Sequence, residues 1–97
     1  MFDRNGKEIT DGSIVAYSFE GDQKSINHVY QQGGVMMIGG LCIENTITNK
    51  FHMTTSKWEE NPIELKWYES EELTVLEGLK VEDVSIELAE KFFGGTQ

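Results

Sequence analysis

The sequence predicts a small, mainly β protein: an antiparallel β-barrel or curled sheet of SH3-like size with one short C-terminal helix. Most of its 97 residues lie in short segments rich in β-branched and aromatic side chains, separated by Gly- and Asp-containing turns. Only residues 85–93 place apolar side chains at helical spacing. Surface scaling allows one buried core for this length and not two, so we expect a single domain over residues 1–97.

The first half of the chain predicts one strand followed by a β-hairpin. Residues 13–19 are rich in strand formers and lie between turn sequences, and residues 24–31 form the next strand. Gln32-Gly33-Gly34 supplies the positive φ angles that a tight hairpin requires. Residues 35–38 then form the return strand of the hairpin. We expect Gly39-Gly40 to produce a bulge or bend in the apolar run.

The middle of the chain predicts a turn and further strands. Glu44-Asn45 is typical of a turn, and residues 46–54 of a strand. Asn61-Pro62 interrupts the run of strands, because the residue before a proline avoids the helical conformation. Apolar and polar residues alternate over residues 63–68, which predicts a strand with Ile63, Leu65 and Trp67 on one face. Residues 72–76 form a last predicted strand that could close the sheet.

The terminal segment changes to helical spacing. Val84, Leu88 and Phe92 recur at every fourth position. Asp83 or Ser85 can cap the first turn, Lys91 lies in the last turn, and a Gly pair follows. We therefore expect a helix over residues 85–93.

The charge is concentrated in the second half. The net charge is −9, and residues 58–97 hold eleven acids against three lysines. Such a surface repels phosphate, which disfavours nucleic-acid binding. The acidic half is either a solvated face or a docking surface for a basic partner. There is no basic leader with a long apolar run and no membrane-length segment, so we expect a cytoplasmic protein.

The opening stretch Asp3-Arg-Asn-Gly-Lys-Glu-Ile-Thr-Asp-Gly-Ser-Ile-Val-Ala-Tyr17 resembles the start of the YopX-like family of phage and prophage proteins. Residues 73–78, followed by an acidic helix start, are similar to the family's late strand and terminal helix. Ser13 stands where the family usually has an acid, and the Asn-Pro step expected after Gly78 is absent. The resemblance implies a small β-barrel of phage or mobile-element origin in a bacterial host, with no catalytic residue to carry over.

Candidate catalytic and metal-binding residues are sparse. His28 and His52 lie far apart without a ligand partner at metal-site spacing, and Cys42 lies within an apolar run. The Gly34–Gly39 spacing suits a phosphate loop, but the Lys and Ser/Thr that must follow are missing. We therefore predict no enzymatic activity, no metal and no cofactor.

The sequence favours a protein–protein interaction module that self-associates as a homo-oligomer. An acidic nucleic-acid mimic that inhibits a basic host protein is the alternative, and a nucleic-acid-binding barrel is a third reading, based on Lys-aromatic pairs such as Lys66-Trp67. Aromatic and acidic residues form the candidate partner surface: Trp58, Glu59, Glu60, Glu64, Trp67, Tyr68, Glu69, Glu71 and Glu72. Phe92 and Phe93 form the candidate oligomer interface.

Overall fold

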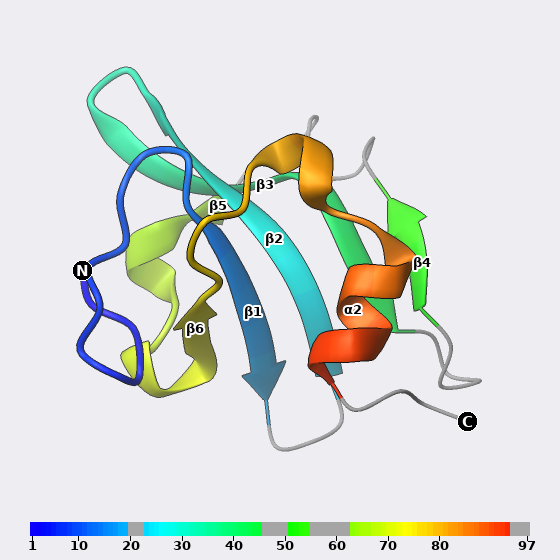
Figure 1. The fold of residues 1–97 in the computed structure, drawn as a ribbon. Coiled ribbons are helices and arrows are strands. Elements are labelled where there is room, and N and C mark those ends of the chain that lie inside the picture. Colours follow the sequence, from blue (N-terminus) through cyan, green and yellow to red (C-terminus); the bar gives the residue numbers. More distant parts are fainter. Residues whose placement is uncertain (20–22, 46–50, 55–62, 94–97) are drawn as a thin grey trace.

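The strands of this chain form one curled antiparallel sheet, with a helix across one face (Figure 1). The computed structural model describes residues 1–19, 23–45, 51–54 and 63–93. The strands follow the order β4–β3–β2–β1–β6, and β5 pairs with β3 beyond this path. Their bounds are β1 Ile14–Phe19, β2 Gln23–Gln32, β3 Val35–Asn45, β4 Phe51–Thr54, β5 Ile63–Glu64 and β6 Leu73–Val75. In the described residues β4 and β6, at the two ends of this order, do not pair with each other, so the sheet is open. Of the two predicted forms, the curled sheet is the one observed.

The β2–β3 hairpin turns as its glycines predict and extends beyond the rest of the sheet (Figure 1). Gly33 and Gly34 have φ angles of 60° and 82°, a combination that suits a tight hairpin. Further along, Asn27 pairs with Cys42 whereas His28 pairs with Gly39, so the register shifts. The predicted bulge at the second glycine pair is therefore confirmed, and β3 continues through it as one strand.

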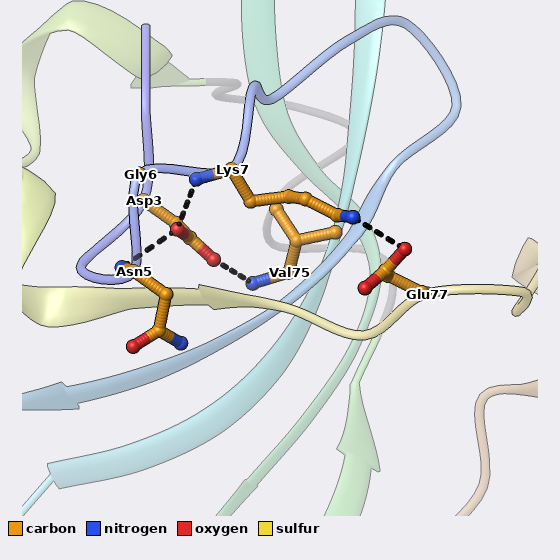
Figure 2. Close-up of a pocket in the computed structure, with 6 residues that line it drawn as sticks. All are labelled: Asp3, Asn5, Gly6, Lys7, Val75 and Glu77. Carbon is orange, nitrogen blue, oxygen red and sulfur yellow. Dashed lines mark hydrogen bonds and ion pairs between the residues drawn. The ribbon is translucent and has the colours of Figure 1, made fainter.

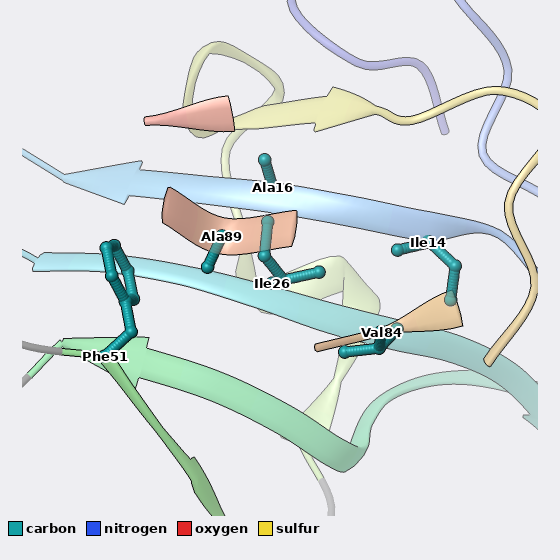
Figure 3. Packing of buried hydrophobic residues seen from close by; sticks show 6 residues of the cluster. All are labelled: Ile14, Ala16, Ile26, Phe51, Val84 and Ala89. Carbon is teal, nitrogen blue, oxygen red and sulfur yellow. The ribbon is translucent and has the colours of Figure 1, made fainter. Parts of the chain in front are cut away.

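The two faces of the sheet carry separate cores, because successive side chains of a strand point to opposite faces. One cluster lies beneath the helix and consists of Ile14, Ala16, Ile26, Phe51, Val84 and Ala89 (Figure 3). The other lies on the opposite face and consists of Ile9, Val15, Val29, Ile38, Leu65 and Leu73. Alternation along β1 separates the two clusters: Ile14 and Val15 are neighbours in the strand and belong to different cores.

Two local predictions were wrong. Glu44 and Asn45 do not form a turn, because they pair with His52 and Phe51 at the end of β3. The strand predicted over residues 63–68 ends after Glu64 and is followed by a 3-10 helix, η1 (Leu65–Trp67). A 3-10 helix has three residues per turn, so the alternation stops there. The predictions for residues 46–50 and for Asn61-Pro62 lie outside the described residues.

The predicted strand over residues 72–76 is present as the shorter β6, which pairs with β1. It does not close the sheet. Its outer edge is instead covered by the N-terminal segment, where the Arg4 N–H donates to the Leu73 carbonyl at 2.9 Å. Short 3-10 helices η2 (Ser70–Glu72) and η3 (Val81–Asp83) flank the strand and the loop after it. Covering an edge strand in this way hinders its pairing with other chains.

The predicted C-terminal helix is present as α2 (Ile86–Phe92). Ser85 is its N-cap and accepts a hydrogen bond of 3.1 Å from the Leu88 N–H. Ala89 is fully buried in the first core cluster (Figure 3), and the backbone of α2 lies closest to β4 and β3. The helix thus seals the first core cluster.

Candidate protein-binding surface

The 3-10 helix η1 separates a buried anchor from an exposed aromatic ring. Leu65 is 3% exposed and belongs to the second core, whereas Trp67, two residues later, is 73% exposed. The sequence prediction that both side chains share a face was therefore wrong. The consequence is that the large indole ring of Trp67 lies on the surface, held on a segment whose first residue is fixed in the core.

An apolar groove is lined in part by Leu65 and Lys66, the two residues that precede this ring in the chain. Its volume is about 350 Å³. It brings together residues from the N-terminus, the β2–β3 hairpin and the β5–η1 segment: Met1, Ile9, Gly34, Val35, Met36, Glu64, Leu65 and Lys66. Met1 and Val35 are 38% and 40% exposed, so part of the lining remains accessible to a partner. We call this feature the Met36 groove.

The rim of the Met36 groove is charged on one side. The Lys66 ammonium lies 3.2 Å from a carboxylate oxygen of Glu64. The same Lys66 Nζ lies 5.5 Å from the centre of the Trp67 ring, within cation–π range. Both charged side chains are solvated, so this pair contributes little to the free energy of folding. The rim therefore presents the Lys66–Glu64 ion pair, with the Trp67 ring within reach of its ammonium, beside an apolar floor.

Four residues of the predicted partner surface follow η1. Tyr68 and Glu72 have structural roles, whereas Glu69 and Glu71 are exposed. Tyr68 is half-buried, and its ring meets that of Tyr17 edge-on, with centroids 5.3 Å apart. Glu72 accepts a hydrogen bond of 2.9 Å from the Glu69 N–H, which closes η2. Burial, together with the charge of Glu72, raises the pKa of Tyr17. Glu69 and Glu71 are exposed and remain available to a partner.

The predicted surface is thus brought together only in part. Glu64 lines the Met36 groove, the Trp67 ring lies within cation–π range of the groove residue Lys66, and Tyr68 packs against the second core. Trp58, Glu59 and Glu60 lie outside the described residues.

The predicted oligomer interface consists of two rings with different environments. Phe93 is half-buried and stacks on Phe51, with centroids 5.6 Å apart and planes inclined by 14°. Phe92 meets Phe93 edge-on at 4.9 Å and is 42% exposed. Phe93 therefore supports the core beneath α2, and Phe92 is the member of the pair that a second molecule could contact.

A second, polar pocket is organised around Asp3 (Figure 2). One carboxylate oxygen accepts hydrogen bonds of 2.8 Å from the N–H groups of Asn5 and Lys7, and the other accepts one from Val75. Burial by itself raises the pKa of this carboxyl, but the three backbone donors and the nearby Lys7 ammonium bring the pKa below its ordinary value. Asp3 is only 4% exposed, and its acceptor capacity is used within the fold, which indicates a structural role.

Among the candidate chemical groups, the side chain of His28 is described, and those of Cys42 and His52 are not. The His28 ring lies 5.6 Å from that of Tyr30, and partial burial lowers its pKa although Asp11 acts in the opposite direction. Over residues 1–19, 23–45, 51–54 and 63–93, no three His, Cys, Asp or Glu side chains gather as a metal site would require. In the same ranges, no helix has the length and apolarity needed to cross a membrane.

Comparison of the chain with models of known protein families, with curated proteins and with solved structures finds no match. The geometry of the site is thus the basis for any functional assignment. Sequence reasoning missed the Met36 groove because its walls come from three segments far apart in the chain. The sequence does show apolar residues at Met1 and at Val35-Met36, directly after the hairpin glycines, but their spacing does not indicate that they meet.

Proposed function

We propose that the chain is a non-enzymatic protein–protein interaction module that self-associates. The observation that carries this proposal is the exposure of large aromatic side chains: Trp67 is 73%, Phe2 55% and Phe92 42% exposed. Aromatic residues dominate the energetics of protein interfaces, because they bury large areas at low entropic cost. The resemblance of residues 3–17 to the YopX-like family supports a phage or prophage origin and a bacterial cytoplasmic location as part of the same proposal.

Self-association is assigned to α2, whose Ile86 and Phe92 side chains are 37% and 42% exposed. Each copy carries a net charge of −9, so copies repel one another at low ionic strength. Salt screens this repulsion over about 8–10 Å. Association through an apolar surface should therefore strengthen as salt rises.

Light scattering on the full chain tests the proposal. We expect a mass above 11.0 kDa that increases with salt, and a mass close to that value for the variant Phe92→Ser. Lys80→Ser, at another exposed position, serves as a matched control that keeps the oligomer. A full-length chain that stays monomeric at every salt concentration contradicts self-association.

A second candidate function is supported by the acidic surface. Residues 63–93 hold nine carboxylates against three lysines, and most of these carboxylates are exposed. A surface of this kind could mimic nucleic acid and occupy a basic host protein. If so, replacing Glu69, Glu71 and Glu77 by Gln should weaken partner binding progressively and make it less sensitive to salt. The same changes leave binding intact if these side chains only keep the protein soluble.

The third reading, a nucleic-acid-binding barrel, has weaker support. Lys7 pairs with Glu77 and Lys66 with Glu64, so these cations are already partly neutralised. Binding to a single-stranded oligonucleotide that disappears on Trp67→Ala would favour it over the interaction module.

A further inference from the structure

We propose that the Met36 groove binds a cationic segment of a partner protein, with an apolar side chain in the groove and an adjacent Arg or Lys between Glu64 and Trp67. This inference rests on the proposed function and deepens it by naming the chemistry of the partner. It uses a surface separate from α2, to which self-association was assigned.

The size and lining of the groove set the first requirement for the ligand. A volume of about 350 Å³ lies at the lower end of the range for small-ligand pockets. Apolar atoms of Met1, Met36 and Leu65 line it. Methionine side chains adapt to differently shaped apolar partners. The groove therefore suits one or two aliphatic or aromatic side chains of a peptide segment.

The rim sets the second requirement. Lys66 now occupies the place between the Glu64 carboxylate, 3.2 Å away, and the Trp67 ring, 5.5 Å away. The structure thus places a cation within reach of both groups. The Lys66 side chain is 69% exposed and held by a solvated ion pair, so an incoming cation can displace it at little cost. An arginine would gain more there, since its planar guanidinium both stacks on the indole and pairs with a carboxylate in two-pronged fashion.

The charge of the whole molecule selects among possible occupants. A cationic segment is attracted to a chain of net charge −9, which raises its association rate. A second copy of the chain would bring the same negative charge to the groove, and a nucleic acid would bring phosphates. Charge complementarity thus assigns the groove to a basic protein segment.

The test uses synthetic peptides and the full chain observed by ¹H–¹⁵N NMR. The probe is a ten-residue peptide of alternating Leu and Arg, and the controls alternate Leu with Glu and Ser with Arg. We expect the Leu–Arg peptide to shift the Trp67 indole and the Met36 amide signals, and neither control to do so. Binding of the Ser–Arg peptide with equal affinity, or no binding by the Leu–Arg peptide, overturns the proposal.

Variants of the rim sharpen the test. Trp67→Ala should weaken binding of the Leu–Arg peptide about tenfold, as loss of an aromatic interface residue commonly does. Lys66→Ala should strengthen it about two- to fivefold, because the competing internal cation is gone. Lys80→Ser, at an exposed position outside both proposed binding surfaces, is the matched control and should leave the affinity unchanged. Equal affinity of the Trp67 and Lys80 variants overturns the assignment.

Failure of this inference and failure of the proposed function give different results. If shifts at Trp67 and Met36 appear on raising protein concentration without peptide, a second copy occupies the groove and the cationic assignment is wrong. If light scattering shows an oligomer while the Leu–Arg peptide does not bind, self-association stands and only the groove assignment fails.

Discussion

A carboxylate oxygen of Asp3 accepts a hydrogen bond of 2.8 Å from the backbone N–H of Val75, a residue 72 positions further along the chain. The other oxygen of the same carboxylate holds the N–H groups of Asn5 and Lys7. One side chain therefore closes the N-terminal turn and also attaches it to the outer edge of β6 (Figure 2). The N-terminal segment carries Met1 and Ile9 into the Met36 groove, so this attachment also positions the proposed binding surface.

Replacing Asp3 by Asn should lower the free energy of unfolding by about 1–3 kcal/mol, the cost of leaving a buried donor or acceptor unsatisfied. An amide keeps one oxygen for Asn5 and Lys7 but turns an NH₂ group toward the Val75 N–H. Urea unfolding measures the loss. Asp83→Asn is the matched control, since Asp83 accepts an exposed hydrogen bond from the Lys80 N–H and should cost less. Equal losses in the two variants would contradict the role given to Asp3.

The same carboxylate predicts an acid-dependent contribution to stability. The pKa of Asp3 is lower in the folded chain than in the unfolded chain, where it is about 3.9. Its contribution is therefore fully present above the unfolded pKa and is lost as the pH falls through the folded pKa. The difference in unfolding free energy between the wild-type chain and Asp3→Asn should shrink below about pH 4. A difference that stays constant from pH 7 to pH 2 would refute the assignment.

The hairpin glycines allow a test of backbone conformation alone. Apart from Gly33 itself and the residues on either side of it, no heavy atom lies within 4 Å of the position of a Cβ at Gly33, yet its φ angle is +60°. Gly33→Ala should therefore cost about 1–2 kcal/mol through the left-handed conformation, without a steric clash of its Cβ with neighbours. Gly33→Asn should cost much less, since Asn tolerates this region. Urea unfolding of the two variants decides the point, and equal stabilities would show that the turn relaxes.

Local turn chemistry and strand periodicity account for the parts of the fold that the sequence could predict. The hairpin at Gly33-Gly34 and the helix cap at Ser85 each depend on neighbouring residues, and both are observed. The bulge in β3 was likewise signalled by its glycine pair.

The failures arise where distant segments compete with a local pattern. Residues 63–68 alternate as a strand should, but burial of Leu65 in the second core favours a 3-10 turn that leaves Trp67 outside. The Met36 groove is a stronger case, because Ile9, Met36 and Leu65 meet only through the sheet and the N-terminal attachment. No local spacing could have indicated that contact.

The N-cap of α2 should contribute measurably to stability. The Ser85 hydroxyl accepts the Leu88 N–H, so Ser85→Ala should lower the free energy of unfolding by about 1 kcal/mol. Ser85→Asp should retain most of the stability, because its carboxylate accepts the same bond and suits the positive end of the helix dipole. Thermal unfolding followed by circular dichroism compares them. Equal losses in both variants would show that the cap contributes little.

The two adjacent phenylalanines at the end of α2 should separate stability from association. Phe93 stacks on Phe51 and packs against the first core cluster. Phe93→Ala should therefore lower the free energy of unfolding by about 2 kcal/mol or more. Phe92 is 42% exposed, so Phe92→Ala should cost less than about 1 kcal/mol and should instead reduce the mass seen by light scattering. Urea unfolding at low protein concentration measures the first effect without interference from association. If Phe92→Ala destabilises the monomer as much as Phe93→Ala does, its ring belongs to the core, and self-association must use another surface.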